Sequence, residues 1–86
     1  MYYVYLLRSI ESGKIYTGFT NDLRKILKDH FRKQVHTTLR MGEMELIFYE
    51  AFKNERDARE REKYFKTTKG KRTVKLMLKY SIAPFV

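Results

Sequence analysis

The segment from residue 2 to residue 9, YYVYLLRS, limits the possible folds more than any other part of the sequence. Its side chains are β-branched, aromatic or aliphatic almost throughout, without alternation of polar and apolar residues. Such a run is typical of a β-strand that is covered on both faces. The chain has 86 residues, which is enough for one domain with one modest core. We therefore expect a single domain, residues 1–86, with this strand inside it.

The rest of the sequence shows a clear order of elements. Ser12-Gly13 indicates a turn, and Asn21 and Asn54 are candidate helix caps. The hydrophobic patterns predict a strand at 14–20, a helix ending near Lys33 and a loop at 34–43. A strand at 44–52 and a helix to about Lys66 follow, and the pattern is interrupted at 67–70. A last helix is predicted at 71–80, with Val74, Met77 and Leu78 pointing inward. The apolar tail, SIAPFV, is expected to pack back on the domain. This order defines an α+β domain with a small antiparallel sheet.

The charge of the chain points to an anionic partner. Nineteen Lys and Arg against ten Asp and Glu give a net charge of +9. All charged residues after Glu62 are basic, namely Lys63, Lys66, Lys69, Lys71, Arg72, Lys75 and Lys79. Within the last predicted helix, Lys71, Lys75 and Lys79 follow one another at intervals of four, where like charges repel. A ridge of this kind favours nucleic acid as the partner, with an anionic membrane surface as the alternative.

Other features narrow the class of protein. No apolar run approaches the ~20 residues of a membrane span, and the amino-terminal segment lacks the pattern of a signal peptide. The absence of cysteine excludes disulfides and thiolate metal sites and fits a reducing compartment. We expect a cytoplasmic protein without a membrane partner.

Two ionisable side chains lie on faces that the patterns predict to be buried. The inward stripe of the first helix consists of Leu23, Ile26, Leu27 and His30. In the second helix Glu62 shares a stripe with Ala58 and Phe65. A buried carboxylate requires a cation, hydrogen-bond donors or a metal. Taken alone, such a histidine is more often a satisfied core residue, and such a glutamate more often reaches solvent or a lysine.

Two tyrosines of the first hairpin are expected on the same face of the sheet. With a two-residue turn, Ser9 lies opposite Tyr16, and Tyr5 shares the face of Ser9 because strand side chains alternate. The offset between the phenols along the strands is not fixed by this pattern. Strand tyrosines are ordinarily packing residues. Together, however, two phenols, an imidazole and a carboxylate in a basic domain could form a phosphodiester-cleaving site.

These motifs resemble a known family. YVYLL at 3–7 and YTGFT at 16–20 resemble the paired signature of the GIY-YIG nuclease domain, in particular its small single-domain bacterial members and the amino-terminal domain of an excinuclease. The resemblance continues through TNDLRKILKDH, ELIFYEAF and REKYFK, and so covers almost the whole chain. It implies a three-stranded antiparallel sheet flanked by helices. It also implies hydrolysis of DNA phosphodiester bonds with one divalent ion, Mg²⁺ or Mn²⁺.

The resemblance assigns roles to single residues. Tyr5 and Tyr16 match the tyrosines of the two motifs, His30 matches the helix histidine, and Glu62 matches the metal-binding carboxylate. Family members carry an arginine one turn before the histidine, and this chain has Ile26 there. An arginine at this position would clamp the phosphate and favour ionisation of the tyrosine. The resemblance therefore implies weakened activity.

Two functions follow as hypotheses. The first is a metal-dependent DNA endonuclease of low sequence specificity, acting in repair or recombination. The alternative is a catalytically inert nucleic-acid-binding module on the same scaffold. The residues expected to contact nucleic acid are Arg8, Lys63, Lys66, Lys69, Lys71, Arg72 and Lys75. The preferred nucleic-acid structure and the oligomeric state stay open.

Overall fold

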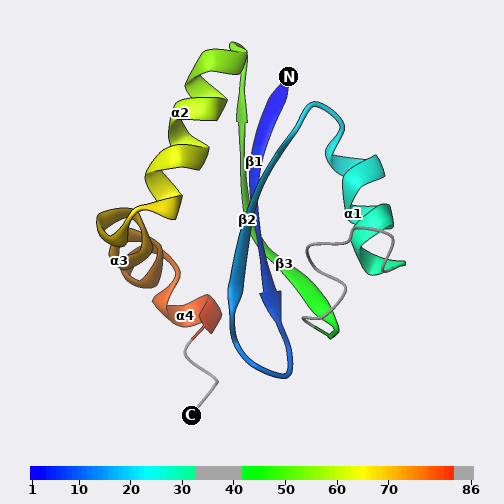
Figure 1. Cartoon of the computed structure of the whole chain (residues 1–86), viewed down its shortest axis with the longest axis vertical. Helices are drawn as coiled ribbons and strands as arrows, with labels where there is room; N and C mark the ends of the chain where they lie inside the picture. The colour runs from blue at the N-terminus through cyan, green and yellow to red at the C-terminus, as the bar shows by residue number, and fades with distance from the viewer. Residues whose placement is uncertain (33–41, 83–86) are drawn as a thin grey trace.

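The structure, a computed structural model, describes residues 1–32 and 42–82 (Figure 1). Its elements are β1 (Tyr2–Ser9), β2 (Ile15–Thr20), α1 (Leu23–Phe31), β3 (Met44–Phe52), α2 (Glu55–Lys66), α3 (Thr68–Met77) and α4 (Lys79–Ile82). The predicted α+β fold with a three-stranded antiparallel sheet is confirmed, and α4 is an additional short helix. Most of the predicted loop at 34–43 and the end of the apolar tail lie outside the described residues.

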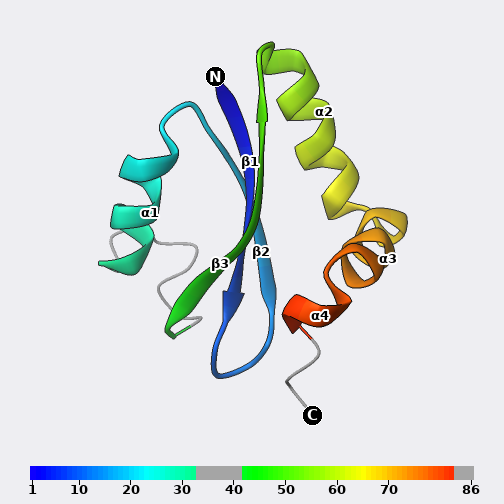
Figure 2. The same ribbon diagram turned by 180° about the vertical axis from the view of Figure 1, so that it is seen from behind.

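Strand β1 lies in the middle of the sheet and is covered on both faces. The strand order is β2-β1-β3, and both pairings are antiparallel. Helices α2, α3 and α4 cover one face of the sheet and α1 the other, as Figure 1 and the view from behind in Figure 2 show. All six residues of β1 from Val4 to Ser9 are buried. This arrangement explains why the sequence of β1 lacks polar alternation.

The main hydrophobic core lies between the sheet and helices α2 and α3. Its buried members are Val4, Leu6, Ala58, Phe65 and Val74. The opposite face of β1 carries Tyr5 and Leu7, because side chains alternate along the strand. The two faces of one strand therefore serve two different layers of helix.

The turn between β1 and β2 is longer than predicted. Ser9 lies opposite Lys14, whose carbonyl accepts a 2.8 Å hydrogen bond from the Ser9 amide. The four-residue turn is closed by the Gly13 amide, which donates to the Ser9 carbonyl at 2.9 Å. Gly13 has a φ of 75°, a conformation that glycine adopts without steric cost.

The longer turn shifts the register by two residues from the predicted one. Tyr16 lies opposite Leu7 rather than Ser9, and Tyr5 lies opposite Gly18. A shift of two leaves the faces unchanged, because the side-chain period of a strand is two. The prediction that both phenols share a face therefore holds, and the two tyrosines come closer along the strands.

The N-cap of the first helix lies one residue later in the sequence than predicted. Asp22, rather than Asn21, is the N-cap of α1, because its side chain accepts a hydrogen bond from the Lys25 amide at 3.1 Å. The cap of α2 is Asn54, as predicted, and it accepts from the Arg56 amide at 2.8 Å.

The helices are interrupted where predicted, but the interruption is confined to Thr67 instead of extending to Gly70, because Thr67 caps a new helix that begins at Thr68. The Thr67 hydroxyl accepts from the Gly70 amide at 2.9 Å and donates to the Tyr64 carbonyl at 2.6 Å. Helix α3 can turn so closely onto α2 only with glycine at position 70, where a Cβ would overlap the Tyr64 carbonyl oxygen.

The inward face of α3 also differs in one residue from the prediction. Val74 is buried and Leu78 packs against the core, as predicted. Met77, which was expected to point inward, is 41% exposed. Leu78 packs against the core, whereas Met77 lies at the edge of the inward face of α3.

The double role of Thr67 predicts a measurable loss of stability. Thr67→Ala should lower the free energy of unfolding by about 1 kcal/mol, because the first turn of α3 loses its cap. Thr68→Ala changes an exposed residue one position later and should stay within ~0.5 kcal/mol of the parent. Urea denaturation measures both, and equal stability of the two variants would contradict the role of Thr67.

Candidate active site

A hydrogen bond joins strand β1 to helix α1. The Tyr5 hydroxyl lies 2.9 Å from His30 Nε2, and both residues are only 2% exposed. His30 ends the inward stripe of α1, whose other members are half-buried, as the spacing predicted. The buried imidazole is thus a satisfied group with a phenol as its partner.

Tyr16 completes an aromatic cluster with these two residues. Its ring centroid lies 5.3 Å from that of His30 and 6.2 Å from that of Tyr5. Tyr16 is half-buried, in contrast to its two neighbours. We call Tyr5, Tyr16 and His30 the aromatic cluster, of which Tyr16 is the member that solvent reaches.

Gly18 allows Tyr5 to lie across strand β2. A Cβ at position 18 would overlap Cζ and Oη of Tyr5, so the phenol passes directly over this glycine. This role of Gly18 was not predicted from the sequence. The signal was the glycine inside the motif YTGFT, since a glycine within a strand often marks a close approach of another group.

The protonation states in the aromatic cluster follow from its burial. Burial raises the pKa of Tyr5 above its usual value, and the nearby Tyr16 hydroxyl and Glu62 carboxylate raise it further. Burial lowers the pKa of His30, and the neighbouring Asp29 carboxylate opposes this effect. At neutral pH the cluster therefore holds a protonated Tyr5 phenol and a neutral imidazole.

Glu62 acts on the aromatic cluster through its charge. Its carboxylate raises the pKa of Tyr5, although α2 covers the opposite face of the sheet. The side chain is 17% exposed, and Oε2 forms a 3.0 Å ion pair with Lys66 Nζ. Ala58 and Phe65 take the fully buried positions of this stripe, whereas Glu62 lies at its edge with a lysine as partner.

The donor set fits a hydrated divalent ion rather than a closed metal cage. Within residues 1–32 and 42–82 no group of three His, Cys, Asp or Glu side chains could hold a metal. Mg²⁺ often binds through one carboxylate together with a substrate phosphate and several waters. Glu62 could supply that carboxylate, since its partner Lys66 has a 56% exposed side chain that can move away.

The position of the family arginine carries no charge in this chain. Ile26 is half-buried on the inward stripe of α1, one turn before His30. Arg24 and Lys25 are exposed, and Lys25 pairs with Asp29 at 3.7 Å. The face of α1 towards the aromatic cluster is thus apolar apart from His30.

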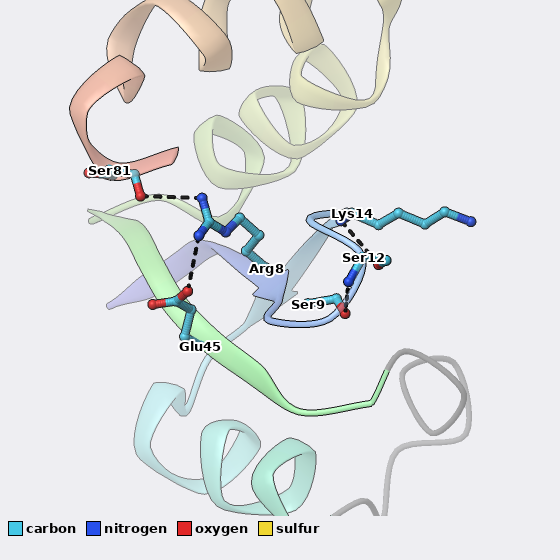
Figure 3. Close-up of polar contacts among 6 residues, drawn as sticks. All are labelled: Arg8, Ser9, Ser12, Lys14, Glu45 and Ser81. Atoms are coloured by element: carbon cyan, nitrogen blue, oxygen red, sulfur yellow. Dashed lines mark hydrogen bonds and ion pairs between the residues drawn. The ribbon is translucent and has the colours of Figure 1, made fainter. Parts of the chain in front are cut away.

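Arg8 is buried, although it was predicted from the sequence to contact nucleic acid. It is 6% exposed, and its guanidinium donates to the Ser81 carbonyl at 3.3 Å and to Glu45 at 3.4 Å (Figure 3). These contacts tie α4 to β1 and β3. We therefore leave Arg8 out of the surface that we propose for nucleic acid.

The basic residues of α2 and α3 that were predicted to contact nucleic acid are exposed. They are Lys63, Lys66, Lys69, Lys71, Arg72 and Lys75. Acidic neighbours on α2 pair with two of them, Lys63 with Glu60 at 3.8 Å and Lys66 with Glu62. Their contact with nucleic acid stays a prediction.

This sheet, with two strand tyrosines and a helix histidine gathered on one face, defines a GIY-YIG-type domain. The model of the GIY-YIG catalytic domain matches residues 1–75, and the chain belongs to this family. A UPF0213 protein of Clostridium perfringens is 35% identical over 83 residues, which cover 95% of this chain and 88% of that protein. A UPF0213 protein of Bacillus pumilus is 37% identical over 67 residues, 77% of this chain and 67% of that protein. No solved structure gives a significant match.

The close approach at Gly18 predicts a penalty that depends on Tyr5. Gly18→Ala should lower the free energy of unfolding by about 1–3 kcal/mol, because the new methyl group displaces the Tyr5 ring. In a Tyr5→Leu background most of this penalty should disappear, since the overlapping atoms are gone. A double-mutant cycle by chemical denaturation measures the coupling. Equal penalties in both backgrounds would show that Tyr5 does not need Gly18.

The lowered pKa of His30 predicts a loss of stability in acid. The unfolded chain binds a proton at this histidine at higher pH than the folded chain does, so the free energy of unfolding falls as the pH drops below about 6.5. His30→Gln should reduce this dependence, whereas His36→Gln, which removes the other histidine of the sequence, serves as the control. Urea denaturation between pH 7.5 and pH 5, a range chosen around the ~6.5 reference value, tests this. Identical profiles for the parent and His30→Gln would contradict it.

Proposed function

We propose that this protein is a divalent-metal-dependent endonuclease that hydrolyses DNA phosphodiester bonds with low sequence specificity. The observation that carries the proposal is the hydrogen bond between Tyr5 and His30, with Tyr16 against both rings and Glu62 close enough to shift the pKa of Tyr5. Membership of the GIY-YIG family supports nuclease chemistry. We assign the activity to repair or recombination of DNA. The lack of cysteine fits a reducing compartment and supports a location in the cytoplasm.

In this proposal Tyr16 meets the attacking water. It is the half-buried phenol, whereas Tyr5 is enclosed and held in its protonated form. Tyr5 and His30 orient Tyr16 from behind. The neutral imidazole of His30 can accept a proton that passes from the water through Tyr16 and Tyr5.

Glu62 would hold the metal ion together with the substrate phosphate. When bound, the ion supplies a Lewis acid that polarises the phosphate and positive charge that stabilises the leaving oxygen. Lys66 then gives up its pairing with Glu62 and becomes available for a neighbouring phosphate. The exposed lysines of α2 and α3 contact the sugar-phosphate backbone, which carries no base sequence, and this explains the low specificity.

Ile26 limits the rate in the proposed enzyme and supports the second candidate function. Loss of one charge-stabilising donor commonly costs about 10²- to 10³-fold in rate. A half-buried isoleucine in place of the phosphate clamp is the specific observation in favour of an inert binding module. The two candidates share the lysines of α2 and α3 and differ only in the chemistry at Tyr16.

A plasmid-nicking assay tests the proposal. Purified protein with supercoiled DNA and Mg²⁺ or Mn²⁺ should nick slowly, and Ile26→Arg should raise the rate by about 10²-fold because the phosphate gains a bidentate donor. Glu62→Gln should abolish nicking in both backgrounds. Glu60→Gln removes an exposed carboxylate from the same helix and should leave the rate unchanged.

The same assay separates the two candidates. No nicking by the parent or by Ile26→Arg, together with intact DNA binding in a gel shift, would exclude the nuclease and leave the binding module. Nicking that survives Glu62→Gln would exclude Glu62 as the metal-binding carboxylate.

A further inference from the structure

A cavity of about 570 Å³ opens along the outer edge of β2, between this strand and helices α2 and α3. Its apolar lining includes Ile15 of β2, Phe65 of α2 and Val74 of α3. The volume lies in the range of about 300–1,000 Å³ that is typical of small-molecule sites. Such an apolar recess could bury a flat, uncharged group.

Four lysines surround this apolar lining. They are Lys14, Lys66, Lys71 and Lys75, all exposed. Among the residues that the structure describes, Lys66 pairs with Glu62, and no ion pair holds the other three. Like charges around one opening repel each other, and a bound anion would relieve this repulsion. The charge of the rim therefore complements a ligand with negative groups on both sides of an apolar part.

The backbone of the edge strand β2 adds hydrogen-bonding groups to the lining of the cavity. The Lys14 carbonyl points to β1, where it accepts from the Ser9 amide. Pairing alternates along an antiparallel edge strand, so Ile15 and Thr17 direct their backbone N–H and C=O groups away from β1. Both residues line the cavity. These backbone N–H donors and C=O acceptors can form hydrogen bonds with the edge of a planar heteroaromatic ring.

The cavity shares residues with the candidate active site. Tyr16 lines the cavity and also belongs to the aromatic cluster. Lys66 lines the cavity and pairs with Glu62. A ligand in the cavity would therefore lie beside a phosphate that is bound at Tyr16 and Glu62.

We propose that this cavity binds an unpaired nucleobase of a single-stranded nucleic acid, while the adjoining phosphates lie on its lysine rim. The inference rests on the proposed nucleic-acid function and names the substrate class, a segment with unpaired nucleotides next to the scissile bond. Only such a segment offers a base that is free to enter the recess. A duplex keeps its bases stacked and paired, and contacts the lysine rim alone.

Binding to three DNA probes tests the proposal without any cleavage. Fluorescence anisotropy in EDTA compares a labelled single strand, the same strand in a blunt duplex, and an abasic strand of equal length. The single strand should bind about tenfold more tightly than the other two, because stacking of one base on an aromatic side chain such as Phe65 commonly contributes about this factor to the affinity. The abasic strand keeps the phosphates and so isolates the contribution of the base.

A matched pair of variants places this preference in the cavity. Thr17→Trp fills the cavity from its wall and should lower the affinity for the single strand about tenfold, with duplex affinity unchanged. Thr68→Trp makes the same exchange at an exposed residue outside the cavity lining and should change neither affinity. The sequence has no other tryptophan, so a blue-shifted emission in Thr17→Trp alone reports that the indole has entered the cavity.

The outcomes distinguish this inference from the nuclease proposal. Equal affinities of the parent protein for the three probes would overturn the cavity inference, even if plasmid is nicked. A single-strand preference that survives a buried indole at position 17 would overturn it as well. A preference that Thr17→Trp removes, in a protein that never nicks DNA, would support the cavity and overturn the nuclease.

Discussion

The burial of β1 on both faces is the constraint on which the rest of the structure depends. Val4 and Leu6 anchor α2 and α3 to one side, and Tyr5 meets α1 through His30 on the other. A strand with apolar side chains on both faces cannot lie at an open surface, so the chain places helices on both sides of the sheet. The domain thereby acquires an apolar core on one face and a polar aromatic cluster on the other. In a chain of 86 residues, one strand thus organises both stability and the candidate chemistry.

Gly18 allows groups on the two faces of the sheet to influence each other. The missing side chain lets the Tyr5 phenol cross β2, where the charge of Glu62 on the opposite layer reaches it. The enclosed Tyr5 and His30 leave Tyr16 as the member of the cluster that solvent can reach. In the proposed function the reaction therefore takes place at the edge of β2, where the cavity also opens. In the same proposal, Ile26 weakens the chemistry there because it supplies no charge to the phosphate.

Positive charge and apolar surface meet at this same edge. The lysine rim of the cavity combines residues of α2 and α3 with Lys14 beside β2, and Lys66 joins it to Glu62. Such a combination suits a flexible anionic strand better than a rigid duplex, because only the flexible strand can direct a base inwards while its phosphates stay outside. Charge alone accounts for affinity to any polyanion. The shape of the cavity distinguishes among polyanions.

The sequence by itself determined the three strands, the first two helices, their order and most of the faces of their side chains. Periodicity is a local property, so it placed His30 on the inward stripe and the two phenols on one face. The tertiary structure decided the partners. The turn closed by Ser9 set the register that brings Tyr5 over Gly18, and Thr67 joined α3 closely to α2. Arg8 became a buried anchor through a carbonyl 73 residues away, a distance in sequence over which no local pattern carries information. Contacts of this kind depend on how the layers pack, and for that reason only the folded chain reveals them.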